Sequence, residues 1–255
     1  MLSKSQRPGL SVRTLGGFAV YASETCLSPN IWKRDKSLQL FQYLLTTKGA
    51  FRHREMITEA LWPELSGEAS ERDFKVALNG IQQAFRNVVE RSVVVRSGVS
   101  YALDGQVVES DVVVFEQKIA SGIQNVLVEK ELATALLREA VILYEGPFLP
   151  GRPYEDWASE TRERLHTLAL STMTTLGESV LSDNPTEALH LAQRVIDFEK
   201  GWEEAYRLAM RAYVILGNRP MALRAYEKCA DVLADLYDVE PLPQTTRLYV
   251  DIKQL

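Results

Sequence analysis

The hydrophobic pattern of the N-terminal part changes from a strand period to a helix period. Between residues 10 and 20, hydrophobic and polar positions alternate around Gly16-Gly17, and a short run, Thr25-Cys26-Leu27, follows; both predict a small antiparallel sheet. Hydrophobic residues then recur at helical spacing and predict three helices, over residues 33–45, 52–61 and 68–88. Apolar runs on either side of Ser97-Gly98 predict a β-hairpin.

The third of these helices is amphipathic. Four apolar residues lie within about 40° of Phe74 on a helical wheel and form the stripe expected to be buried: Leu78, Ile81, Phe85 and Val88. The opposite face, with no acid inside the helix, carries Arg72, Lys75, Val76, Asn79, Gln82, Gln83 and Arg86. All of these except Val76 are candidate base-reading residues, because Arg and Lys can bond guanine edges or phosphates and Asn and Gln can bond adenine edges. The alternative is a solvated helix face that happens to lack acids.

Charge is divided unevenly along the chain. Residues 1–105 carry 14 Lys and Arg against 10 Asp and Glu, a net charge of +4, whereas the remaining residues carry 15 and 24, a net charge of -9. The first part therefore suits a polyanion better than the whole-chain charge of -5 suggests. Its candidate contacts to the DNA backbone are Lys33, Arg34, Lys36, Arg52, Arg54 and Arg96. Each could neutralise a phosphate, which sets affinity without reading sequence, or could be an ordinary surface cation.

The order of sheet, three helices and hairpin resembles the winged helix-turn-helix of OmpR-type DNA-binding domains. It resembles more closely the version at the N-terminus of the Streptomyces antibiotic regulatory protein (SARP) family. The matching stretches are Val12-Arg13-Thr14-Leu15-Gly16-Gly17-Phe18, Trp32-Lys33-Arg34-Asp35-Lys36-Ser37, Glu59-Ala60-Leu61-Trp62-Pro63-Glu64 and Phe74-Lys75-Val76-Ala77-Leu78-Asn79. The resemblance implies that the third helix reads the major groove of double-stranded DNA and that the hairpin contacts the flanking backbone.

One departure from that family concerns the third helix. Where the family typically has an Arg-rich run, this chain has Asn79-Gly80-Ile81-Gln82-Gln83, which lowers the charge available for phosphates. Gly80 costs about 1 kcal/mol relative to Ala in the middle of a helix. It therefore indicates either a close packing contact or an altered affinity for DNA.

From residue 106 onward the pattern is almost entirely helical. We accordingly expect a winged helix-turn-helix domain over residues 1–105 and a helical domain over residues 106–255. A Gly- and Pro-rich stretch at residues 146–151 interrupts the helices. Glu187-Ala188-Leu189 recurs 34 residues later as Met221-Ala222-Leu223, which is the tetratricopeptide period. The expected fold class is mainly α: an α+β winged helix followed by an all-α, tetratricopeptide-like domain.

The helical part resembles the bacterial transcriptional activator domain, which follows the winged helix in SARP regulators. The resemblance is carried by Tyr144-Glu145-Gly146-Pro147-Phe148-Leu149-Pro150, Tyr154-Glu155-Asp156-Trp157-Ala158, Arg162-Glu163-Arg164-Leu165, Met210-Arg211-Ala212-Tyr213, Arg224-Ala225-Tyr226-Glu227 and Val239-Glu240-Pro241. It implies a homodimer on DNA and contact with RNA polymerase. Five aromatic residues either line a groove for a partner or form core between helices: Tyr154, Trp157, Trp202, Tyr206 and Tyr213.

Other classes of protein fit the sequence less well. No GxxxxGK[ST] phosphate loop occurs, and His53, His166 and His190 lie on different expected helices, so we expect no catalytic residues, no metal and no cofactor. The chain has no apolar run long enough for a membrane span and no apolar core of a secretory signal. Cys26 and Cys229 lack metal-binding or disulfide-framework spacing. A cytoplasmic protein is expected.

Two functional hypotheses remain, with a small-molecule sensor in the helical groove as a variation on the first. The first is a sequence-specific transcriptional regulator, an activator that binds direct-repeat promoter DNA and contacts RNA polymerase. The second is a protein-interaction scaffold whose winged helix has weak or no affinity for DNA, which the Gln82-Gln83 pair and the modest charge of the N-terminal part keep open.

Overall fold

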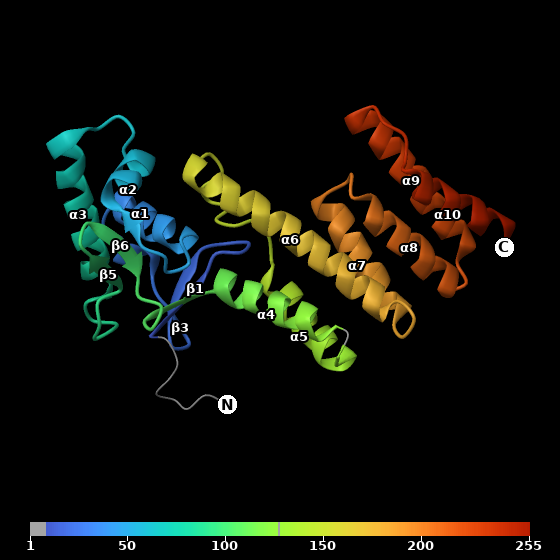
Figure 1. The fold of residues 1–255 in the computed structure, drawn as a ribbon, viewed down its shortest axis with the longest axis horizontal. Coiled ribbons are helices and arrows are strands. Elements are labelled where there is room, and N and C mark those ends of the chain that lie inside the picture. Colours follow the sequence, from blue (N-terminus) through green and yellow to red (C-terminus); the bar gives the residue numbers. More distant parts are fainter. Residues whose placement is uncertain (1–8, 127) are drawn as a thin grey trace. The chain divides into compact units, whose positions relative to one another are not determined.

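The structure, a computed structural model, describes residues 9–126 and 128–255. The expectation that the N-terminal stretch is no secretory signal concerns residues that lie mostly outside these ranges. The chain divides into two compact units (Figure 1). The N-terminal unit comprises the residues up to Gln117 together with Leu143–His166, and the second unit comprises Lys118–Ile142 and Thr167–Leu255. The expected fold class, mainly α with a small N-terminal sheet region, is confirmed. The division at residue 105 stays a prediction about domains.

The N-terminal unit begins with a four-stranded sheet of order β3-β2-β1-β7. Its strands are β1 (Leu10–Arg13), β2 (Ala19–Ala22), β3 (Thr25–Cys26) and β7 (Val108–Ser110). β1 pairs antiparallel with β2, as the alternating pattern predicts, and parallel with β7, which the pattern did not predict. Leu10 and Val12 are buried whereas Ser11 and Arg13 are exposed, so one face of β1 packs on the core.

The three predicted helices are present with shifted ends. They are α1 (Asp35–Thr46), α2 (Arg54–Leu61) and α3 (Gly67–Phe85). α2 starts two residues later than predicted because Arg52–His53 form a strand, β4, that pairs with β6 (Ser100–Leu103). β6 and β5 (Val94–Ser97) form the predicted hairpin, and its turn uses Gly98 at a φ of 59°, which favours glycine.

An aromatic core fixes the orientation of α3. Phe74, Ile81 and Phe85 of the predicted stripe are buried, and Leu78 and Val88 pack against the same core. The Phe85 ring centroid lies 5.4 Å from that of Trp32 and 5.5 Å from that of Phe41. Such ring pairs add to the free energy gained from apolar burial, so the polar face of α3 is turned to solvent.

The Gly- and Pro-rich interruption forms a loop that pairs with the first sheet. The backbone N–H of Leu149 donates to the Thr14 carbonyl at 2.9 Å, and the N–H of Gly16 donates to the Pro147 carbonyl at 3.0 Å. Phe148, between these two contacts, is fully buried. This loop therefore belongs to the N-terminal unit, although it lies beyond residue 105.

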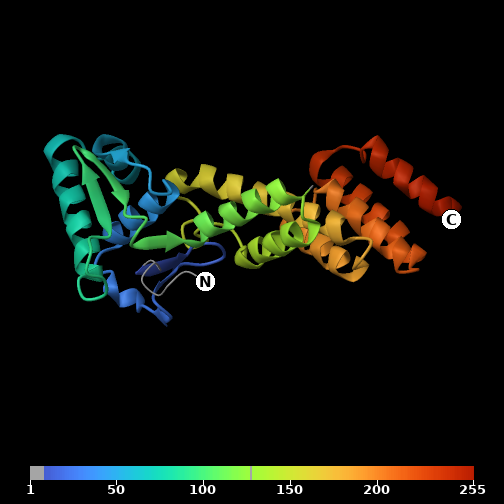
Figure 2. The same cartoon turned by 60° about the horizontal axis from the view of Figure 1, so that its bottom comes forward.

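From Asp111 onward the described secondary-structure elements are all helices (Figure 2). They are α4 (Asp111–Asn125), α5 (Lys130–Leu143), α6 (Asp156–Val180), α7 (Pro185–Phe198), α8 (Glu203–Ile215), α9 (Arg219–Tyr237) and α10 (Pro243–Gln254). α7 packs on α8, α8 on α9, and α9 on α10. Asn184 and Asn218, one 34-residue period apart, cap α7 and α9 by accepting from the N–H groups of Glu187 and Met221. The 34-residue repeat of the sequence therefore appears in the structure as the same Asn cap at the start of α7 and of α9.

Candidate DNA-binding surface

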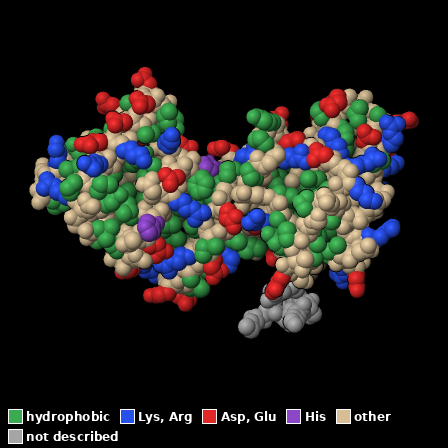
Figure 3. Space-filling view, turned by 180° about the vertical axis from the view of Figure 1, so that it is seen from behind, with side chains coloured by type: hydrophobic (Ala, Val, Ile, Leu, Met, Phe, Trp, Pro, Cys, Tyr) green, Lys and Arg blue, Asp and Glu red, His purple; other side chains and the backbone are tan. Residues whose placement is uncertain are grey.

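The candidate base-reading residues lie on one exposed side of the N-terminal unit. Arg72, Lys75, Asn79, Gln82, Gln83 and Arg86 are all exposed. Arg86 directly follows the last residue of α3. Figure 3 shows Lys and Arg side chains in blue along the outer edge of this unit, with acidic side chains in red among them. The helical wheel predicted this exposure correctly, and the role of these residues in DNA binding stays a prediction.

Two carboxylates lie at the N-terminal end of this face, so the expectation of a face without acids is wrong there. Glu68 and Glu71 line a shallow groove along α3 together with Lys75. The Glu71 carboxylate lies 2.9 Å from the Lys75 ammonium and 2.9 Å from the Arg54 guanidinium. The hydrogen bond from Lys75, followed by the charge of Arg54, holds the pKa of Glu71 below its ordinary value.

The spacing of Glu71 and Lys75 could have revealed this ion pair. The two residues are four apart, which places their side chains next to each other on a helix. On the wheel Glu71 falls just outside the polar face, but its side chain is long enough to reach it. The pairing leaves Lys75 and Arg54 less charge for DNA.

The C-terminal half of the face has a different character. Within the described residues, no side-chain hydrogen bond or ion pair engages Asn79, Gln82, Gln83 or Arg86. Asn79, Gln82 and Gln83 end in amide groups, which both donate and accept hydrogen bonds, whereas the Arg86 guanidinium only donates. This half is therefore available for hydrogen bonds to another molecule.

Gly80 lets α3 lie close to α1. A Cβ at position 80 would lie 2.1 Å from the Oγ and 2.8 Å from the Cβ of Ser37. Ser37 is buried, and its hydroxyl has no hydrogen-bond partner among the described residues. The structure supports the packing interpretation of Gly80.

The three cations near the start of α1 differ in whether they contact other residues of the protein. Lys33 and Arg34 are exposed, and neither has an ion pair within the described residues. The Lys36 ammonium donates to the Leu61 carbonyl and lies 5.5 Å from the centroid of the Trp62 ring. Lys36 therefore holds α1 against the end of α2, whereas Lys33 and Arg34 remain available for phosphates.

The other three candidate contacts to the DNA backbone, Arg52, Arg54 and Arg96, also differ in whether the protein itself holds their side chains. Arg52, on β4, is exposed, but Arg54 is held by Glu71. Arg96, on the hairpin, is exposed, and its guanidinium lies 5.8 Å from the centroid of the Tyr101 ring. The Tyr101 ring restricts the orientation of the Arg96 guanidinium but leaves the guanidinium exposed to solvent.

The five aromatic residues of the later part do not line a single groove. Tyr206 is buried, and Trp157 packs against α1 with a ring distance of 5.9 Å to Tyr43. Trp202 and Tyr213 are half-buried, whereas Tyr154 is 95% exposed. Core packing accounts for Tyr206 and Trp157.

Other kinds of site find no support in the part of the chain that the structure describes. There, His, Cys, Asp and Glu side chains form no group that could hold a metal ion. Cys26 and Cys229 are free thiols, and burial raises the pKa of Cys229 to about 12. Across residues 9–126 and 128–255, each helix is too short or too polar to cross a membrane.

Comparison with known proteins identifies a matching family and a similar solved structure. The family described as bacterial transcriptional activator domain matches residues 110–253. The structure of Mycobacterium tuberculosis EmbR in complex with a low affinity phosphopeptide is similar, with a TM-score of 0.82 and 16% sequence identity over 97% of this chain. The match spans 66% of the EmbR chain, and at this identity it establishes the fold. No curated protein sequence matches the chain.

The matched family segment makes up more than half of the 255 residues. The likeness to EmbR extends over the winged helix that precedes it. The resemblance to SARP-type regulators, a winged helix followed by the activator domain, is therefore confirmed. The chain belongs to the bacterial transcriptional activator domain family and is a transcriptional regulator of the SARP type.

Proposed function

We propose that this regulator binds specific DNA sequences by placing α3 in the major groove. The observation that carries the proposal is the exposed C-terminal half of the α3 face, where Asn79, Gln82, Gln83 and Arg86 have no side-chain partner within the described residues. Asn and Gln can each make two hydrogen bonds to an adenine edge, and Arg can make two to guanine. No catalytic step, metal or cofactor is part of the proposal.

Backbone contacts would come from the elements that flank α3. Lys33 and Arg34 at the start of α1, and Arg96 on the hairpin, present exposed cations. Contacts of this kind set the orientation of a protein on DNA and make its affinity depend on salt.

The activator domain would supply the protein contacts. Family membership supports RNA polymerase as the partner and two copies of the chain on a direct-repeat promoter site, with activation as the outcome. Successive helix pairs such as α7 to α10 form extended surfaces suited to protein partners. Acting on bacterial promoters places the protein in the cytoplasm.

The direct test is selection of DNA by the purified full chain. The chain is incubated with fragmented host genomic DNA, and bound fragments are recovered over a salt series and sequenced. We expect enrichment of a short repeated element that survives moderate salt. Recovery of DNA without sequence preference, lost steeply as salt rises, would contradict the proposal.

Asn79→Ala and Lys33→Ala should have different effects on DNA binding. Asn79→Ala should reduce discrimination between the selected site and a scrambled one by about 1–3 kcal/mol, because an adenine contact is lost. Lys33→Ala should weaken binding to both DNAs equally and lower the salt slope by about 1. Fluorescence anisotropy over a salt series measures both. Equal effects of the two changes would mean that α3 does not read bases.

Glu71→Gln should strengthen DNA binding without regard to sequence. The change removes a carboxylate and releases Lys75 and Arg54 from their ion pairs, so the affinity for any DNA should rise about three- to tenfold at low salt. Glu59→Gln, on α2, is a matched control because Glu59 is exposed and has no ion pair within the described residues. An unchanged affinity in Glu71→Gln would place this end of α3 away from DNA.

A protein-interaction scaffold is the second candidate. Glu68 and Glu71 favour it, since they lower the positive charge along the α3 face. DNA binding that stays undetectable at low salt, with a folded chain, would establish this alternative over the first.

A further inference from the structure

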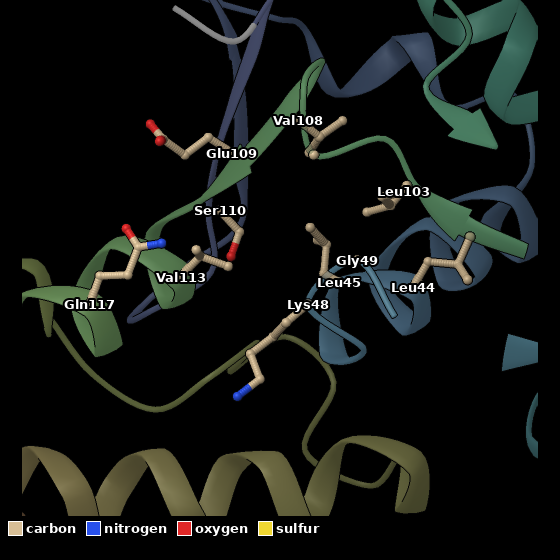
Figure 4. Close-up of a pocket in the computed structure, with 11 residues that line it drawn as sticks. Leu44, Leu45, Lys48, Gly49, Leu103, Val108, Glu109, Ser110, Val113 and Gln117 are labelled. Carbon is tan, nitrogen blue, oxygen red and sulfur yellow. The ribbon is translucent and has the colours of Figure 1, made fainter. Parts of the chain in front are cut away.

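A cavity of about 200 Å³ lies in the N-terminal unit, and no residue of α3 lines it (Figure 4). The end of α1, the end of β6, β7 and the first turns of α4 contribute to its wall. Its apolar lining consists of Leu44, Leu45, Leu103, Val108 and Val113, and the rest consists of two glycines and of Lys48, Glu109, Ser110 and Gln117. An apolar cavity of roughly 150 Å³ suffices for a benzene ring. The space here therefore matches one six-membered ring with a substituent.

Of the four polar residues that line the cavity, Ser110 is the buried one. Its side chain is more than nine-tenths buried, and its hydroxyl oxygen has no hydrogen-bond partner among the described residues. Figure 4 shows Ser110 and Val113 on one side of the cavity and Leu45 and Leu103 on the other. A buried hydroxyl without a partner costs about 1–3 kcal/mol, so a ligand that offers it a hydrogen bond gains a specific contact.

The charges at the edge of the cavity disfavour a charged ligand. The Lys48 ammonium lies 2.9 Å from the Glu116 carboxylate, which also pairs with Arg164. The Glu109 carboxylate is directed away from the cavity (Figure 4). Gln117, the other polar side chain at this edge, carries no charge.

We propose that this cavity is a binding site for a small uncharged molecule. The molecule has one apolar ring and one hydroxyl or carbonyl group, which forms a hydrogen bond with the Ser110 hydroxyl. The site is smaller than the pockets of about 300 Å³ or more that hold drug-sized ligands. Ser110 provides the specificity, and the apolar wall provides most of the affinity. The proposal does not depend on DNA binding.

Phenol and toluene are suitable probes because they share a ring and differ in whether a hydroxyl or a methyl group is attached. Each is titrated into the full chain while the methyl resonances of Val113, Leu103 and Leu45 are followed by NMR. We expect saturable shifts of these methyl groups with both probes and about three- to tenfold tighter binding of phenol, the value of one hydrogen bond.

Three variants locate the site. Ser110→Ala should keep the cavity but remove the preference for phenol over toluene. Val113→Phe should fill the cavity and abolish binding of both probes. Val114→Phe is the matched control, since Val114 is the next residue of α4, is half-buried and does not line the cavity.

Two outcomes would overturn the proposal. One is the absence of saturable methyl shifts in the unmodified chain. The other is an unchanged preference for phenol in Ser110→Ala, which decides the question even if Val113→Phe does not fold.

Discussion

Gly80→Ala is expected to lower the free energy of unfolding by about 2 kcal/mol, although alanine is the better helix former. In an open helix the change would gain about 1 kcal/mol. Here the new methyl group would lie 2.8 Å from the Ser37 Cβ, a contact that no change of side-chain rotamer relieves. α1 and α3 would have to move apart. Urea denaturation followed by circular dichroism measures the loss.

Two control variants separate packing from helix propensity. Asn79→Ala lies next to Gly80 on the exposed side of α3, so its unfolding free energy should stay the same or rise slightly. Ser37→Ala removes a hydroxyl that has no hydrogen-bond partner among the described residues and should be nearly neutral. Added to Gly80→Ala, it should recover part of the lost stability. A gain of stability in Gly80→Ala alone would refute the packing explanation.

The same contact bears on the proposed DNA surface. Gly80 lies between Asn79 and the pair Gln82-Gln83, so the backbone that carries these amides is held against α1 at this point. An outward shift of α3 would displace the amides relative to Lys33 and Arg34. Gly80→Ala should therefore weaken DNA binding even at temperatures at which the variant is folded.

Local patterns were sufficient to predict the three helices and the hairpin. Phe74, Ile81 and Phe85 recur at helical spacing within one segment, so the buried side of α3 follows from the period alone. The pairing of β1 with β7 could not be predicted in this way. Val12 and Ser110 are partners across the sheet, but nothing in the period around either residue specifies the other. The same holds for the contact between Thr14 and Leu149.

The candidate site shows a similar division. The wheel correctly placed Asn79 and Gln82 on the exposed side because exposure depends on the helix period. It did not predict that Glu71 holds Arg54, since Arg54 lies on a different helix and the contact depends on how α2 packs against α3. Residues that face solvent could be found from the sequence, whereas their electrostatic partners required the structure.

Asp111→Ala is expected to destabilise the N-terminal unit by about 3 kcal/mol or more. The Asp111 carboxylate accepts hydrogen bonds from the Thr14 N–H at 2.6 Å, the Leu15 N–H at 2.8 Å and the Val112 N–H at 2.9 Å. It also accepts from the Thr14 hydroxyl at 2.6 Å. Thr14 and Leu15 are fully buried, so water cannot replace the lost acceptor.

Asp111→Asn is the informative comparison. Its amide oxygen can still accept from the backbone of Thr14 and Leu15, but its NH₂ group would face the Val112 N–H, so the loss should be smaller than for alanine. Asp251→Ala, at an exposed position of α10, should leave stability within about 0.5 kcal/mol of the parent. Equal midpoints of urea denaturation for Asp111→Ala and the parent would show that these hydrogen bonds contribute nothing.

Asp111 also determines where the chain can be divided. It lies inside the segment that matches the activator domain family, yet its hydrogen bonds go to the turn after β1. A fragment that ends at residue 105 would lack both β7 and this carboxylate, leaving the edge of β1 and two buried N–H groups without acceptors. Such a fragment should therefore unfold at a lower urea concentration than Asp111→Ala in the full chain. The opposite order would mean that the winged helix is complete without the start of the activator domain.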